Sequence, residues 1–129
     1  YGCTFEGNAG PGFAICGSFG PVRNAIVEKS TMKGNGQGSL DGSGYGVSLS
    51  RANTTRITEC TIEDNANAGI CAYNSTQATT IQQCTVQNNQ GNGILIYQSP
   101  GGSISQCTLQ GNTGQAIEIS ESSDWTTDM

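Results

Sequence analysis

The acidic and basic residues are the first candidates for chemistry, because hydrolysis of a glycosidic bond needs two carboxyl groups that flank the bond. The chain of 129 residues has ten Asp and Glu residues and no histidine, and Glu63-Asp64 is its only adjacent acidic pair. One set combines acids with bases, namely Asp41, Arg51, Arg56 and Glu63. A general base beside cations that neutralise an anionic substrate would suit proton abstraction. Because the sequence fixes no geometry for this set, we predict no catalytic residues.

Two tyrosines point instead to binding. Tyr73 and Tyr97 occupy equivalent outward positions in two successive copies of a repeat that is described below. Aromatic rings stack on sugars, but aromatic pairs on neighbouring strands also stabilise sheets, and both interpretations stay open. Under the first interpretation, we predict a carbohydrate contact formed by Tyr73, Tyr97, Asp41 and Arg51, with a polysaccharide or another glycan as the partner.

The six cysteines allow three kinds of chemistry: disulfides, metal binding or a reduced core. Four of them recur at one position of the repeat, namely Cys3, Cys60, Cys84 and Cys107. Since their spacing follows the repeat, a reduced inward-facing stack is favoured over disulfides. The other two, Cys16 and Cys71, cannot be paired from the sequence. Without histidine or a CxxC pair, we predict no metal and no cofactor.

Cys3, Cys60, Cys84 and Cys107 each begin one copy of a six-residue phrase that occurs five times. Each copy reads Cys or Ser, Thr, an apolar residue, two variable residues and Asn. The copies begin at positions 3, 30, 60, 84 and 107, and they read CTFEGN, STMKGN, CTIEDN, CTVQNN and CTLQGN. Apolar anchors on either side of the phrase give a basic period of 23 residues, with insertions of 4, 7 and 1 residues at two corners.

The spacing of apolar residues within each period indicates strands. They recur at every second position in short runs rich in Ile, Val and Thr, and Gly and Asn separate the runs. Three such runs per period describe one turn of a three-faced parallel β-solenoid, whose coils bury their apolar faces against one another. We predict an all-β domain of about five coils over residues 1–121, with a C-terminal tail or cap at 122–129.

The pattern apolar-x-x-Cys-Thr-apolar-x-x-Asn, followed by Gly-apolar-x-apolar, resembles the repeat of the right-handed parallel β-helix family. This family includes pectate-lyase-like and other polysaccharide-associated solenoids. The chain is also similar, more weakly, to repeats of autotransporter surface proteins. The resemblance implies a right-handed helix and polysaccharide as a partner. Because the histidine-containing catalytic elements of such enzymes are missing here, we favour a non-catalytic structural or carbohydrate-contacting module. The alternative is a fragment of a lyase, epimerase or hydrolase that acts on uronic acid glycans.

Two further positions of the repeat lead to predictions. We call the equivalent residues of successive copies a column. The asparagine column is predicted at a corner, where the amides bond to the turn and to one another, rather than in a sugar site. Its members are Asn8, Asn35, Asn65, Asn89 and Asn112. One threonine per coil faces outward among charged neighbours, which makes an ice-binding solenoid a lesser alternative.

Composition excludes some partners and suggests a location. A net charge of −5 with only five basic residues argues against nucleic acid. No apolar run is long enough to insert into a membrane. The sequons at Asn53 and Asn74 lie in equivalent loops and predict N-glycosylation in a secreted eukaryotic protein. We expect an extracellular or cell-surface location. We also expect either a piece of a larger β-helix or a unit that stacks on copies of itself.

Overall fold

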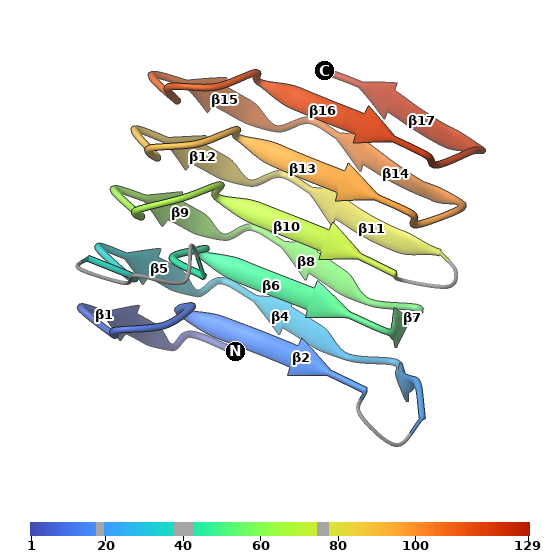
Figure 1. The fold of residues 1–129 in the computed structure, drawn as a ribbon, viewed down its shortest axis with the longest axis horizontal. Coiled ribbons are helices and arrows are strands. Elements are labelled where there is room, and N and C mark those ends of the chain that lie inside the picture. The colour runs from blue at the N-terminus through green and yellow to red at the C-terminus, as the bar shows by residue number, and fades with distance from the viewer. Residues whose placement is uncertain (18–19, 38–42, 75–77) are drawn as a thin grey trace.

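The computed structural model describes residues 1–17, 20–37, 43–74 and 78–129. The chain winds through five coils, and each coil contributes one strand to each of three sheets (Figure 1). All strand pairs among the described residues are parallel and join equivalent positions of successive coils. The all-β parallel solenoid predicted from the repeat is therefore confirmed.

The first sheet is built from the six-residue phrase. Its central apolar residue points into the core, where Met32, Ile62 and Val86 are completely buried, while the preceding threonine faces outward. Alternation of this kind follows from the two-residue period of a strand. The strands are β1 (Thr4–Glu6), β5 (Thr31–Lys33), β9 (Thr61–Glu63), β12 (Thr85–Gln87) and β15 (Thr108–Gln110).

The second sheet carries the later pair of apolar anchors. Its inward positions, such as Val47 and Leu49, are completely buried, so this sheet supplies a second wall of the core. The seven-residue insertion lies between β5 and β6, and residues 38–42 within it are outside the described part of the chain. The strands are β2 (Phe13–Cys16), β6 (Val47–Ser50), β10 (Ile70–Tyr73), β13 (Ile94–Tyr97) and β16 (Ile117–Ser120).

The third sheet closes each coil. Its strands are β4 (Ile26–Glu28), β8 (Arg56–Thr58), β11 (Thr79–Gln82), β14 (Gly102–Ser105) and β17 (Trp125–Asp128). Residues 122–129, which we predicted as a tail or cap, contain β17, and this strand pairs with β14 in register. A Cβ at Gly102 would lie 2.5 Å from the indole of Trp125, so the close packing of this ring requires glycine there. A short pair, β3 (Val22–Arg23) with β7 (Ala52–Asn53), extends the corner beside this sheet.

The predicted asparagine ladder is confirmed at the corner between the first and second sheets. Asn65 is completely buried, and its Nδ2 donates to Oδ1 of Asn89 at 2.9 Å and to the carbonyl of Met32 at 3.1 Å. Its backbone N–H also donates to Oδ1 of Asn89, at 3.1 Å. Asn35 and Asn89 repeat this pattern, so each buried amide joins three successive coils.

The cysteine column is reduced, as the repeat favoured. Its members Cys60, Cys84 and Cys107 are free thiols that are buried in successive coils. Cys84 shares hydrogen bonds with both neighbouring thiols, which raises its pKa and lowers the pKa values of Cys60 and Cys107 to about 7. Cys3 was predicted to face the core, but it is exposed because its coil is the first and only one side of it is covered.

Candidate functional site

A groove of about 300 Å³ lies on the outer face of the second sheet. Parallel register explains its shape, because equivalent residues of successive coils form straight columns. Ser48, Cys71 and Leu95 share one outward column, and Tyr73 and Tyr97 share the next. Tyr45, which precedes β6, is the sixth described residue that lines the groove. We call these six residues the tyrosine groove.

The two predicted tyrosines lie side by side in this groove. Their rings are parallel within 6°, with centroids 6.0 Å apart. The next residues of their column are Ser50 in the coil before and Ser120 in the coil after, both of which are small. Tyr73 is 45% exposed. The pair therefore presents ring surface to solvent, and its predicted contact with carbohydrate stays a prediction.

Two polar neighbours, Glu121 and Gln98, lie at the edge of the groove beside Tyr97. The carboxylate of Glu121 raises the pKa of Tyr97, first by its charge and then by accepting a hydrogen bond. Gln98 donates to the same carboxylate at 2.7 Å. The Tyr97 hydroxyl therefore lies beside a carboxylate at the edge of the groove.

Sequence reasoning missed Tyr45, Ser48 and Leu95 and left the role of Cys71 open. Tyr45 stands in the long insertion, where the period gives no register, and its hydroxyl hydrogen-bonds to the Cys71 thiol. Burial raises the pKa of Cys71 to about 11, so this thiol stays protonated at neutral pH. The sequence did contain one signal for this site. Cys71 and Leu95 are apolar residues at outward positions of adjacent coils, where alternation predicts polar residues.

Arg51, the other predicted contact residue that the structure describes, does not line the groove. Arg51 directly follows Ser50, is exposed and has a left-handed backbone with φ of 53°. Asp41 lies outside the described residues. The sequon residues Asn53 and Asn74 are both partly buried near the same corner, between the second and third sheets, and glycosylation of either stays a prediction.

The acid–base set considered above is spread over different parts of the solenoid. Arg51 follows the second sheet, Arg56 begins β8 in the third, and Glu63 ends β9 in the first. Glu63 accepts a hydrogen bond from Gln87 at 2.7 Å and pairs with Lys33 at 3.1 Å. These contacts lower the pKa of Glu63, so its carboxylate stays ionised and engaged. The three described members of the set do not form one site.

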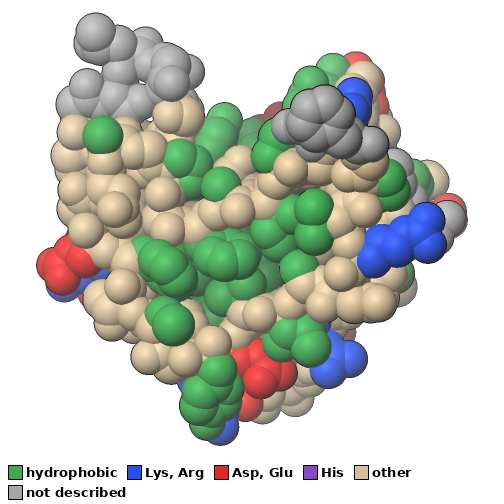
Figure 2. All heavy atoms as spheres, turned by 90° about the horizontal axis from the view of Figure 1, so that it is seen from below, with side chains coloured by type: hydrophobic (Ala, Val, Ile, Leu, Met, Phe, Trp, Pro, Cys, Tyr) green, Lys and Arg blue, Asp and Glu red, His purple; other side chains and the backbone are tan. Residues whose placement is uncertain are grey.

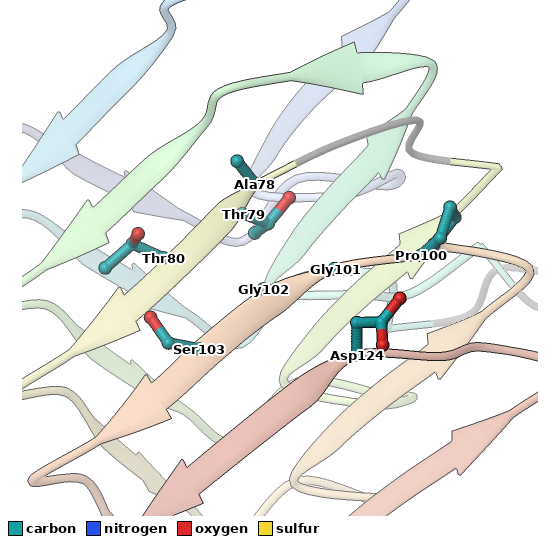
Figure 3. Close-up of a pocket in the computed structure, with 8 residues that line it drawn as sticks. All are labelled: Ala78, Thr79, Thr80, Pro100, Gly101, Gly102, Ser103 and Asp124. Carbon is teal, nitrogen blue, oxygen red and sulfur yellow. The ribbon is translucent and has the colours of Figure 1, made fainter.

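A second hollow, of about 620 Å³, lies over the third sheet near the C-terminal end (Figure 3). Its lining consists of small side chains and backbone, with Thr80 and Ser103 on adjacent strands and Asp124 before β17. The described part of this lining offers hydroxyl groups and one carboxylate but no aromatic ring. The described residues include no group of three or more His, Cys, Asp or Glu placed to hold a metal ion.

The repeat, the three parallel sheets and the asparagine ladder define a parallel β-helix. The chain belongs to the right-handed β-helix family, because the family model described as "Right handed beta helix region" matches residues 1–128. This match includes β17. Searches for related curated proteins and for related solved structures found no match. Within the described ranges, no helix is long and apolar enough to cross a membrane.

Proposed function

We propose that this β-helix is a non-catalytic module that binds a neutral polysaccharide through the tyrosine groove. One observation carries the proposal: two parallel tyrosine rings stand beside a partly apolar floor on an outer face of the solenoid. Sugar rings present flat C–H surfaces that pack against aromatic rings, while their hydroxyls bond to polar groups at the rim. The tyrosine hydroxyls supply such polar groups.

The charges around the groove favour a neutral ligand over a uronic acid polymer. Among the described residues that line the groove, none carries a charge at neutral pH. Glu118 continues the floor column beyond Leu95, and Glu121 stands beside Tyr97, so carboxylates border the C-terminal end of the groove. An anionic sugar would be repelled there. The volume of about 300 Å³ lies at the lower end of the range for ligand pockets, which suits roughly one or two sugar rings.

An extracellular or cell-surface location forms part of the same proposal. The resemblance to polysaccharide-associated solenoids and the two sequons support it. A stiff stack of coils also suits a structural role, since it holds a binding surface at a fixed orientation.

The test is titration of the chain with neutral and with uronic acid oligosaccharides, followed by isothermal calorimetry and NMR. We expect binding of a neutral glycan, with chemical-shift changes confined to the second sheet. Tyr73→Ala and Tyr97→Ala should each weaken binding about tenfold, which corresponds to ~1.4 kcal/mol. Tyr1→Ala is the matched control, because Tyr1 is 78% exposed and lies outside the groove.

Two outcomes would overturn the proposal. One is the absence of binding across an array of neutral glycans. The other is turnover of a uronic acid polymer to a 4,5-unsaturated product that is lost in Arg51→Ala or Asp41→Ala, since this would show the enzymatic alternative.

A further inference from the structure

The first described coil forms the N-terminal face of the solenoid in this structure. The edge strands β1, β2 and β4 each pair on one side only, with β5, β6 and β8. Figure 2 looks onto this end and shows hydrophobic side chains gathered across its middle. Phe5 and Phe13 are partly buried there and pack edge to face, with ring centroids 5.8 Å apart. Unpaired strand edges around an apolar centre form a template for further strand pairing.

The asparagine ladder gives this face a polarity. Asn8 donates from its backbone N–H and its Nδ2 to Oδ1 of Asn35, at 3.1 and 2.8 Å. Every later ladder asparagine receives the equivalent bonds on its Oδ1, whereas none of the described residues donates to Oδ1 of Asn8. The N-terminal face therefore ends in a hydrogen-bond acceptor.

The C-terminal face ends in the complementary donors. Asn112 donates one Nδ2 hydrogen to the carbonyl of Val86 at 3.0 Å, and its Oδ1 accepts from Asn89. In the buried asparagines, the backbone N–H and the second Nδ2 hydrogen bond to the Oδ1 of the next coil. Among the described residues, no coil follows Asn112 to supply that oxygen. The C-terminal face thus offers the hydrogen-bond donors that Oδ1 of Asn8, on the N-terminal face, can accept.

The two faces also match in side-chain type and in spacing. In both coils the next strand begins at the fifth position after the ladder asparagine, at Phe13 or at Ile117. If coil 1 of one copy followed coil 5 of another in the same register, like would stack on like in five columns. These pairs are Cys107 with Cys3, Leu109 with Phe5, Asn112 with Asn8, Ile117 with Phe13, and Ile119 with Ile15.

We propose that the N-terminal face of one copy docks on the C-terminal face of a second copy, in the register just described. The contact continues the three sheets and the asparagine ladder. Because it joins two different surfaces, it is heterologous, and repetition without closure gives filaments. This proposal does not depend on the tyrosine groove, which lies on an outer face and stays open in such a stack.

The third sheet would bring unfavourable neighbours together in this contact. β17 and β4 would meet with Asp128 beside Glu28 and with Thr127 beside Val27. Like charges directly opposite on neighbouring strands cost about 0.2–1 kcal/mol, and salt screens them. Association should therefore strengthen with ionic strength and with removal of either carboxylate.

The test is size-exclusion chromatography with light scattering of the full chain, over a range of protein concentrations at low and at moderate salt. We expect the mass to rise with protein concentration, and more so at moderate salt. Asp128→Asn should lower the concentration of half-association about 1.4- to fivefold, the equivalent of the repulsion it removes. Asp64→Asn is the control, because it removes the same charge from a corner in the middle of the stack.

A disrupting variant completes the design. Phe5→Lys places a charge in the apolar N-terminal face and should leave a folded monomer, which circular dichroism checks. A wild-type chain and an Asp128→Asn chain that both remain monomeric at the highest soluble concentration would overturn the proposal. Association that Asp64→Asn strengthens as much as Asp128→Asn would overturn it too, and this result can be read even if Phe5→Lys does not fold.

Discussion

The replacement Asn89→Ala tests how much of the stability comes from the amide ladder. Asn89 is completely buried, and its Nδ2 donates to Oδ1 of Asn112 at 2.9 Å and to the carbonyl of Ile62 at 3.2 Å. Its Oδ1 accepts from Nδ2 of Asn65 at 2.9 Å and from the backbone N–H of Asn65 at 3.1 Å. Alanine removes all four bonds and leaves that buried N–H without a partner.

The expected cost follows from these contacts. An unpaired buried N–H costs about 1–3 kcal/mol, and each of the three other hydrogen bonds contributes about 0.5–1.5 kcal/mol. Because Nδ2 of Asn65 keeps its bond to Met32, and Oδ1 of Asn112 keeps the backbone N–H of residue 89, the loss is partial. We therefore expect Asn89→Ala to lower the free energy of unfolding by about 3–5 kcal/mol.

Asn8→Ala is the matched control for this measurement. Asn8 is exposed, and its side chain makes one ladder bond, from Nδ2 to Oδ1 of Asn35. Its loss should cost about 0.5–1.5 kcal/mol. Urea denaturation followed by circular dichroism and by the fluorescence of Trp125, the single tryptophan, gives both values. Equal effects of the two replacements would refute the reasoning, since burial and bond number would then not determine the cost.

Three other predictions follow from the same columns. Gly69→Ala should cost about 1–3 kcal/mol in the free energy of unfolding, because a Cβ there would lie 2.3 Å from a buried valine, whereas Gly10→Ala meets open space and should be nearly neutral. Ellman's reagent should titrate the exposed Cys3 in the native chain and the buried Cys60, Cys84 and Cys107 only after unfolding, and failure of these three to react after unfolding would reveal a disulfide. The folded-state pKa of Glu63 is lowered, so its ionised form stabilises the fold above the unfolded value of about 4.3, and this contribution is lost as the pH falls through the lower, folded-state pKa. Denaturation at several pH values should therefore show that Glu63→Gln is less stable than wild type near neutral pH and equal to it in acid.

The fold could be predicted from sequence because every coil has to satisfy the same physical needs. A repeated inward apolar residue and a repeated corner asparagine recur only if the coils stack in register, and the ladder geometry bears this out. What the repeat cannot show is where a column ends. Cys3 obeys the pattern of Cys60 and Cys84 but lies in an edge coil, so the same residue type is exposed there and buried in the middle.

The segment that contains β17 shows a second limit of pattern reasoning. At the column of Ile81 and Ile104, the last coil carries Thr127 instead of an apolar residue. The apolar pattern is therefore lost, although backbone pairing between β14 and β17 continues. Strand pairing depends on main-chain hydrogen bonds, which no side-chain pattern reports directly.

The candidate site was predictable only where it follows the period. The adjacency of Tyr73 and Tyr97 came from their spacing, and the parallel rings agree with it. Tyr45 lies in an insertion, which shifts the register by an unknown amount until the structure places it over Cys71. Leu95 was not predicted as a site residue, because the alternation of inward and outward residues along a strand places its side chain in solvent.

The contrast between the outer faces of the first and second sheets gives the groove its significance. The outer column of the first sheet runs through Lys33, Glu63 and Gln87, whose side chains bond to one another along the axis and remain solvated. The equivalent face of the second sheet exposes aromatic rings beside Leu95. Leaving apolar surface in water forgoes about 25 cal/mol for each Å² that could be covered. The sheet itself does not require this arrangement, since the first sheet pairs equally well with polar residues. A ligand that covers the rings would recover that free energy, and so the titration with neutral glycans is the decisive test of what this face does.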